Sequence, residues 1–300
     1  MRGSSVLAIS TLLIAVACSE DPSSSPPRGS SASSSASSGG VAADEDGGSS
    51  GGGDGGSTTS SSGGSSGSPS TGPNGACKIQ GQAHKTGLTS LTHSNGLKYS
   101  VYAPASYDKN VGHAVVILMH GQDSDGVPEL NTLWKPIADT DGLVLIAPRG
   151  SRPSTNNNPN VGNWATADLE LVLDVMTDVD ACYNVLTKKH LLWGFSAGTF
   201  YGYLLGIGAA ESFSGLAMGG ANTSFARQNG YAPADAKWKI PVSHVHGKQD
   251  FNAISITYQD RDDFIAAGHV FTLHEHDGGH SITPAQVKMQ WDDLKASSSP

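Results

Sequence analysis

The segment from Leu191 to Thr199 constrains the fold more than any other part of the chain. Apolar residues run directly into Gly194-Phe195-Ser196-Ala197-Gly198, and the segment from Thr199 to Ala210 is rich in Gly, Tyr and Leu and can form a helix. In a strand–turn–helix unit the serine stands on a sharp bend, and glycines on either side leave room where side chains would collide. We therefore expect Ser196 at the tip of such a turn, beside the positive end of the helix that follows.

The Gly-x-Ser-x-Gly pattern also occurs around Ser49 and Ser65, but the context there is different. Both serines lie between Ser19 and Ala76, a region of mostly Ser, Gly, Ala, Pro and Thr without any Leu, Ile, Phe, Trp or Tyr. Such a segment cannot bury enough apolar surface to offset its conformational entropy, so residues 19–76 are predicted to be a disordered linker. Residues 77–300 carry all the aromatic side chains and suit one α/β domain.

Residues 1–18 are predicted to be a targeting segment. Arg2 supplies a short positive region, and the apolar run from Val6 to Ala17 has the length of a signal-peptide core but is too short to span a bilayer. Small residues precede Cys18, which resembles a bacterial lipoprotein signal in which the cysteine is lipidated. We expect export, with Cys18 anchoring the chain at the outer membrane or cell surface. The alternative is secretion, or release into the periplasm, after cleavage near Ala17.

The two remaining cysteines are Cys77 and Cys182. A single pair in an exported domain indicates a disulfide, which would fasten the first residues of the domain to the start of a core strand. The alternative is two unrelated thiols.

Charge and histidine placement restrict the partners and cofactors. The net charge is −9 and no basic stripe is present, which argues against a nucleic-acid partner. Two histidine pairs, His244/His246 and His274/His276, alternate along predicted strands, so each pair shares a face and could hold a metal. We favour packed histidines within a sheet and therefore expect no metal and no cofactor. The oligomeric state is left open.

Apolar runs of strand length alternate with segments of helical periodicity. Strands are predicted at residues 96–102, 114–119, 143–147, 190–193, 213–218, 242–246 and 270–276, and helices at 130–140, 165–179, 199–210, 254–267 and 284–295. The residues between 218 and 242 are predicted to be loop, too short for a substantial cap domain. This alternation predicts a doubly wound, mostly parallel sheet, whose functional residues lie at the carboxyl ends of the strands.

Two further residues complete a nucleophilic constellation with Ser196. A serine hydroxyl needs a base to remove its proton, and the base needs a carboxylate to fix its tautomer. Asp250 and His280 follow the last two predicted strands, on loops at the same edge as the serine, in the order Ser, Asp, His. The other candidates, Asp260, Asp262 and Asp263, fall in or beside a helix and are interpreted as surface residues. The sequence therefore predicts a triad of Ser196, Asp250 and His280.

A tetrahedral intermediate also needs hydrogen-bond donors for its oxyanion. The amide after the nucleophile, at Ala197, supplies one, and the loop after the first buried strand supplies the other. We assign the second donor to Gln122, because His120-Gly121 would bend the chain so that this amide points inward; His120 itself is expected only to pack. Trp164 and Phe195 are predicted to contact the substrate.

This constellation resembles the α/β-hydrolase superfamily, and more narrowly the polyhydroxybutyrate-depolymerase-like esterases, a group that includes feruloyl and acetylxylan esterases. The resemblance covers residues 96–294. It rests on the motifs Tyr102-Ala103-Pro104, Leu118-Met119-His120-Gly121, Gly142-Leu143-Val144, Ala147-Pro148-Arg149-Gly150, Asn163-Trp164, Asp168, Gly194 to Gly198, His246-Gly247 with Asp250, and Gly279-His280.

The resemblance and the triad together imply a serine carboxylic-ester hydrolase acting through an acyl-enzyme. With little cap and a surface tether, we expect an open site for extended or polymeric esters, and polysaccharide-linked acyl groups, polyesters and short-chain esters are all left open. The alternatives within this fold are a serine peptidase or a lipase. From a different class, a catalytically silent hydrolase fold could serve as a surface binding module, and a metal-dependent hydrolase is a third option.

Overall fold

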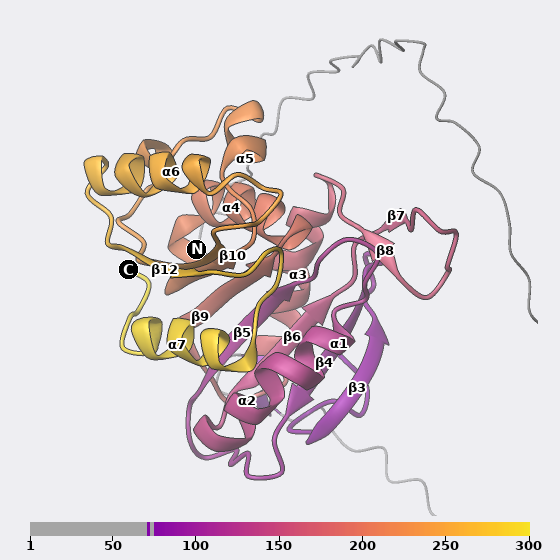
Figure 1. Cartoon of the computed structure of the whole chain (residues 1–300). Helices are drawn as coiled ribbons and strands as arrows, with labels where there is room; N and C mark the ends of the chain where they lie inside the picture. The colour runs from indigo at the N-terminus through magenta and orange to yellow at the C-terminus, as the bar shows by residue number, and fades with distance from the viewer. Residues whose placement is uncertain (1–70, 73–74) are drawn as a thin grey trace, which may run out of the picture. The chain divides into compact units, whose positions relative to one another are not determined.

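The computed structural model describes residues 71–72 and 75–300; the predicted signal segment, Cys18 and most of the predicted linker lie outside this range. The domain is built on an eight-stranded sheet (Figure 1). Its strands are β3 (Gly87–Thr92), β4 (Lys98–Ala103), β5 (His113–Met119), β6 (Val144–Pro148), β9 (Val185–Phe195), β10 (Gly215–Gly219), β11 (Val242–Gly247) and β12 (Phe271–His276).

The spatial order of the strands is β12-β11-β10-β9-β5-β6-β4-β3. Strands β5, β6 and β9 to β12 pair in parallel, whereas β4 pairs antiparallel with both β3 and β6. The predicted doubly wound, mostly parallel sheet is confirmed.

The apolar run of β5 explains why this strand lies at the centre. Val115, Ile117 and Met119 belong to one core cluster, and Val116 and Leu118 to a second. Because successive side chains of a strand point to opposite faces, a continuous apolar run fits a sheet that is covered on both sides.

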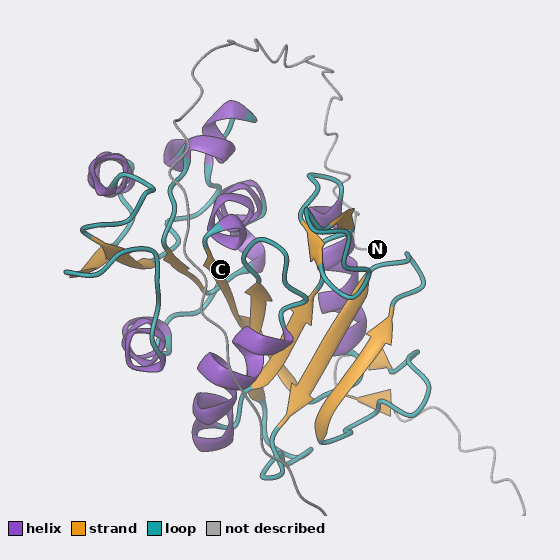
Figure 2. Cartoon of the chain, turned by 45° about the vertical axis from the view of Figure 1, so that its right-hand side comes forward, coloured by secondary structure: helices purple, strands orange, loops and turns teal. Residues whose placement is uncertain are grey.

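Helices supply those two covers (Figure 2). On one face lie α3 (Asp168–Asp180), α4 (Ala197–Gly208) and α6 (Ile254–Ala266), which contribute to the first cluster. On the other lie α7 (Pro284–Leu294) and a continuous helical segment made of α1 (Val127–Glu129), the π-helical η1 (Leu130–Trp134) and α2 (Lys135–Asp141). Within residues 75–300, no helix is long and apolar enough to cross a membrane.

Several short elements were not predicted. The 218–242 segment contains α5 (Ser224–Gln228) and the 3-10 helix η3 (Pro233–Asp235), and a further 3-10 turn, η2 (Ala210–Ser212), follows α4. Edge strand β3 was missed, as was a two-stranded pair, β7 (Arg152–Pro153) with β8 (Gly162–Asn163). Ordered pairing also begins before residue 77, where β1 (Thr71–Gly72) meets β2 (Gly75–Ala76).

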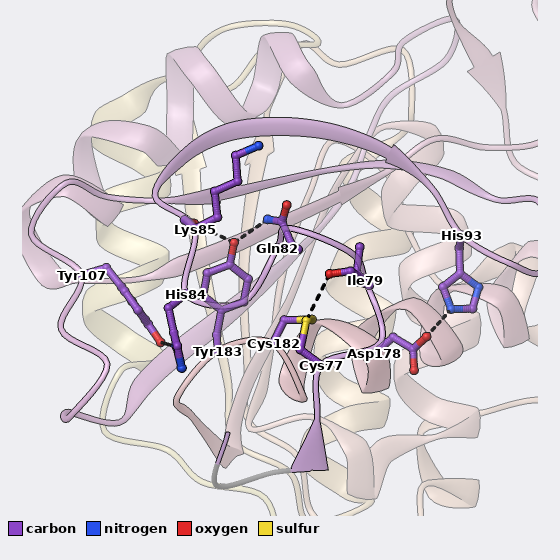
Figure 3. Close-up of a disulfide and its surroundings, with 10 residues drawn as sticks. All are labelled: Cys77, Ile79, Gln82, His84, Lys85, His93, Tyr107, Asp178, Cys182 and Tyr183. Carbon is purple, nitrogen blue, oxygen red and sulfur yellow. Dashed lines mark hydrogen bonds and ion pairs between the residues drawn. A yellow bond between two sulfur atoms is a disulfide. The ribbon is translucent and has the colours of Figure 1, made fainter. Parts of the chain in front are cut away.

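The predicted disulfide between Cys77 and Cys182 is present, with a Cα–Cα distance of 4.4 Å across 105 residues of sequence (Figure 3). Cys182 lies just before the start of β9, and Ser196 lies just after its end. The disulfide is therefore at the edge of the sheet formed by the amino ends of the parallel strands, and Ser196 is at the opposite edge, formed by their carboxyl ends. Beside it, the buried Tyr183 hydroxyl accepts a hydrogen bond from Gln82 Nε2 (2.5 Å) and donates one to the Lys85 carbonyl (2.8 Å). We call these five residues the disulfide edge.

Candidate active site

Ser196 is held in a strained turn between β9 and α4. Its backbone has φ 57° and ψ −120°, a conformation that residues with a side chain rarely adopt and that costs about 1–3 kcal/mol. A Cβ atom at Gly198 would lie 1.8 Å from the Met119 carbonyl oxygen, and one at Gly194 would lie 2.5 Å from that of Gly198. The two glycines of the pattern are therefore required by backbone contacts that leave no room for a side chain.

The buried hydroxyl of Thr199 fastens this turn to the next strand. Its oxygen lies 2.8 Å from the Gly194 carbonyl oxygen and 2.6 Å from that of Gly219, and it accepts a hydrogen bond from the Gly219 amide (3.0 Å). The Ser196 amide donates to the Gly219 carbonyl (2.9 Å). The serine turn is thus joined to the carboxyl end of β10.

Asp250 and His280 are joined on the loops after β11 and β12. Both Asp250 oxygens lie near His280 Nδ1, at 3.0 and 2.8 Å, and the Asn252 amide donates to Asp250 Oδ1 (2.8 Å). The Asp250 side chain is 1% exposed. Because a carboxylate only accepts, Nδ1 of His280 carries the hydrogen, which leaves Nε2 free to act as a base. The two loops pack closely: a Cβ at Gly247 would lie 2.3 Å from the Gly279 carbonyl.

The His280 ring lies beside the serine turn. Its centroid is 4.9 Å from that of Phe195, the residue before Ser196. A Cβ at Gly220 would lie 3.2 Å from His280 Cε1, and Gly220 directly follows the residue whose carbonyl binds the Ser196 amide. Within residues 75–300 the Ser196 hydroxyl makes no hydrogen bond, as is common before a substrate aligns the groups. The fold therefore gathers the three predicted residues at one edge.

The predicted oxyanion donors lie on two adjoining segments. The Ala197 amide is the first of α4, so no helical carbonyl precedes it as an acceptor. The loop carrying Gln122 follows β5, and a Cβ at Gly121 would lie 3.8 Å from the Ser196 Cβ. Asp123 is held at φ 55°, with its amide donating to Asn163 Oδ1 (2.9 Å).

His120 and Trp164 hold the backbone at the start of this loop by hydrogen bonds. Nε2 of the buried His120 accepts a hydrogen bond from the Gly150 amide (3.0 Å), and Nδ1 donates to the Gly121 carbonyl (2.6 Å). Burial lowers the pKa of His120, consistent with the expected packing role. Trp164 is 2% exposed, and its Nε1 donates to the His120 carbonyl (2.8 Å). The substrate contact of Trp164 stays a prediction.

Phe251 was not singled out from the sequence. Its side chain is 78% exposed, and its ring centroid lies 4.2 Å from that of His280. The imidazole is therefore flanked by Phe251 and by the half-buried Phe195. A single exposed phenylalanine in a sequence carries no signal of this kind, since only the fold brings it against His280.

The remaining histidine and aspartate candidates have structural partners. His244 and His246 are buried and bonded to each other, and His274 Nε2 pairs with Asp293 (2.7 Å). Among the residues described, no group of three or more His, Cys, Asp or Glu side chains could hold a metal ion. The interpretation of Asp260 as a surface residue was wrong: it is buried, because the Thr223 amide (2.7 Å) and Arg227 satisfy its carboxylate.

Comparison with known proteins supports the fold. No family model matches the chain. A bifunctional acetylxylan esterase/xylanase from Neocallimastix patriciarum is 28% identical over 160 residues, which is 52% of this chain and 22% of that protein. The chain thus spans about a fifth of the length of that relative.

Three solved structures share the architecture at low identity. Esterase PE8 has a TM-score of 0.54 at 18% identity, covering 67% of this chain and 98% of its own. A ferulic acid esterase from Anaeromyces mucronatus has a TM-score of 0.53 at 14% identity, covering 71% and 90%. Dipeptidyl peptidase 4 from Porphyromonas gingivalis has a TM-score of 0.52 at 14% identity, covering 70% and 36%. With the strand order above, these likenesses give the chain an α/β-hydrolase-like fold.

Proposed function

We propose that the protein is a serine carboxylic-ester hydrolase that works through an acyl-enzyme. The observation that carries the proposal is the strained Ser196 turn beside a histidine whose Nδ1 is held by the buried Asp250. The acetylxylan esterase similarity supports an ester as the substrate.

In the proposed reaction Ser196 Oγ attacks the ester carbonyl while His280 Nε2 takes the hydroxyl proton. His280 then gives that proton to the departing alcohol oxygen, and the acyl group stays on Ser196. A water molecule next attacks the acyl carbonyl and loses a proton to the same Nε2. The proton returns to Ser196 Oγ as the acid leaves. Asp250 keeps the tautomer correct and stabilises the imidazolium.

The negative charge of each tetrahedral intermediate would be held by the amides of Ala197 and Gln122. The first amide also lies at the N-terminus of α4, whose dipole favours negative charge there. Because Asp123 and Trp164 fix the loop from both sides, these donors would be in place before the substrate arrives, which is what makes such stabilisation effective.

For the substrate we propose an acyl group on an extended or polysaccharide-linked alcohol, in keeping with the polyhydroxybutyrate-depolymerase-like resemblance. The support is the short connection between β10 and β11, which holds only α5 and η3, and the exposed Phe251 ring beside His280, which offers an apolar surface. We further propose export with lipidation at Cys18. The Cys77–Cys182 disulfide supports an oxidising compartment.

The test is hydrolysis of p-nitrophenyl esters from acetyl to palmitoyl, with Ser196→Ala and, as a matched control, Ser281→Ala. We expect Ser196→Ala to lower kcat by about 10⁴-fold or more, the control to match the parent, and chelators to have no effect. Unchanged activity in Ser196→Ala would refute the proposed nucleophile.

Labelling by a fluorophosphonate probe separates the alternatives. A chain that is labelled at Ser196 but turns over only peptide substrates would be a peptidase, and an optimum at long acyl chains would indicate a lipase. A folded chain that neither reacts with the probe nor hydrolyses any ester would be a binding module.

A further inference from the structure

A buried chain of hydrogen bonds leads from helix α4 to the loop after β11, which carries Asp250. The Tyr203 hydroxyl lies 2.7 Å from His244 Nδ1, His244 Nε2 lies 3.3 Å from His246 Nδ1, and His246 Nε2 lies 2.7 Å from the Asn252 carbonyl oxygen. We call these four residues the histidine chain. The proposed reaction uses none of them directly.

The far end of the histidine chain fixes which atoms donate. A carbonyl oxygen only accepts, so His246 Nε2 must carry the hydrogen that binds Asn252. Burial lowers the pKa of both histidines, which favours the neutral form, in which each ring has one acceptor nitrogen. His246 Nδ1 therefore accepts from His244 Nε2, and His244 Nδ1 accepts from the Tyr203 hydroxyl. The donors all point toward Asn252.

Asn252 connects the histidine chain to the candidate active site through two hydrogen bonds. Its amide donates to Asp250 Oδ1 (2.8 Å), and its side-chain Nδ2 donates to the Gly220 carbonyl (2.7 Å). Gly220 is the residue at which a Cβ would lie 3.2 Å from His280 Cε1. Asn252, whose carbonyl His246 binds, is thus linked both to the carboxylate that binds His280 and to the backbone beside the imidazole.

We propose that His246 is a positioning residue for Asp250, acting through the Asn252 carbonyl. This inference rests on the proposed function only for its kinetic consequence. Packing alone would not require two buried imidazoles here, because buried polar groups are costly unless each finds a partner. In the histidine chain every ring nitrogen has one, and the Thr257 hydroxyl lies 3.1 Å from His246 Nδ1 as well.

Two substitutions at one position separate positioning from filling space. The amide of a glutamine reaches about as far as imidazole Nε2, and that of an asparagine about as far as Nδ1. His246→Gln therefore keeps a donor for the Asn252 carbonyl, whereas His246→Asn keeps only a group that faces His244. We expect His246→Asn to lower kcat for p-nitrophenyl acetate by about 10- to 100-fold with KM nearly unchanged, because small displacements of catalytic groups cost this much. His246→Gln should stay within a few-fold of the parent.

The second readout does not depend on turnover. The downfield NMR resonance of the His280 Nδ1 hydrogen, assigned by its loss in His280→Gln, reports the bond to Asp250 whether or not the protein is an esterase. It should persist in His246→Gln and weaken or shift in His246→Asn. An unchanged resonance and parental kcat in His246→Asn would overturn the inference, and so would equal losses in both variants. Should His246→Asn fail to fold, His246→Met fills similar space without any donor for the Asn252 carbonyl, and it should lower kcat relative to His246→Gln. Parental kcat and an unchanged resonance in His246→Met would also overturn the inference.

Discussion

The two edges of the central sheet are held together in different ways. At the disulfide edge, a covalent bond and the buried Tyr183 hydroxyl join residues that lie about one hundred positions apart in the chain. At the opposite edge Ser196 is in a strained conformation, and Phe251 leaves most of its ring in solvent. The disulfide edge is stabilised by a covalent cross-link. The opposite edge contains a strained backbone and an exposed aromatic ring, both of which cost free energy, at the place where the proposed chemistry occurs.

This difference indicates that stability and activity can be changed separately. Strain is retained at functional sites when the surrounding structure over-determines it. Here the surroundings are the backbone contacts of Gly194 and Gly198 and the hydroxyl of Thr199. Substitutions at the disulfide edge should therefore act on the free energy of unfolding, and substitutions at the serine edge mainly on kcat.

The largest effect on stability is expected from Cys77→Ser. Opening a loop closed across 105 residues should lower the free energy of unfolding, by about 2–5 kcal/mol and toward the upper end because the loop is long. Urea denaturation of the variant and of the oxidised parent measures this difference. The kcat per active site, counted with a fluorophosphonate titration, should remain parental. A fall in that kcat would mean that the two edges are coupled.

A smaller effect on stability, and one that stabilises, is expected when glycine replaces the strained Ser196. Ser196→Ala and Ser196→Gly both remove the proposed nucleophile, but only glycine adopts φ 57° without strain. After allowing for the greater flexibility of glycine in the unfolded chain, Ser196→Gly should be more stable than Ser196→Ala by about 1 kcal/mol. Thermal unfolding of the pair tests this. If the two variants were equally stable, the strain of the serine turn would be no larger than the cost of glycine's flexibility, about 0.5–1 kcal/mol.

Much of this arrangement could be predicted from the sequence, because its signals are local. The apolar runs of β5, β6 and β9 and the helical periodicity of α3 identify elements that are buried by their own composition. The glycines around Ser196 mark a backbone with no space for side chains. Ser196, Asp250 and His280 each follow a strand, and because these strands are parallel their three loops lie at one edge of the sheet.

What the sequence did not reveal depends on contacts between distant residues. Edge strand β3 alternates half-buried and exposed positions and lacks a strong apolar run. Asp260 is buried only because Thr223 and Arg227, more than thirty positions earlier, satisfy its carboxylate. Phe251 and the histidine chain acquire meaning only once α4, β11 and the loop after β11 lie together.

The smallest expected effect concerns the partly exposed Asp123, which holds the loop of the proposed oxyanion donor. Hydrogen bonds from the Thr155 hydroxyl and amide, and from Asn163, lower the pKa of Asp123 to about 2 from 3.8. Because the folded pKa is the lower one, the stability that this carboxylate contributes is present above pH 3.8 and is lost as the pH falls toward 2.

Asp123→Asn tests that window, since asparagine tolerates the same positive φ. The free energies of unfolding of parent and variant, measured in urea, should differ most at pH 5 and converge near pH 2. When both proteins also carry Thr155→Val, which removes the hydroxyl donor, this difference should be smaller. Because Asp123 is partly exposed, solvent screening keeps the difference small. A constant gap across this range would mean that shape and not charge holds the loop, and the serine edge would then depend on backbone packing alone.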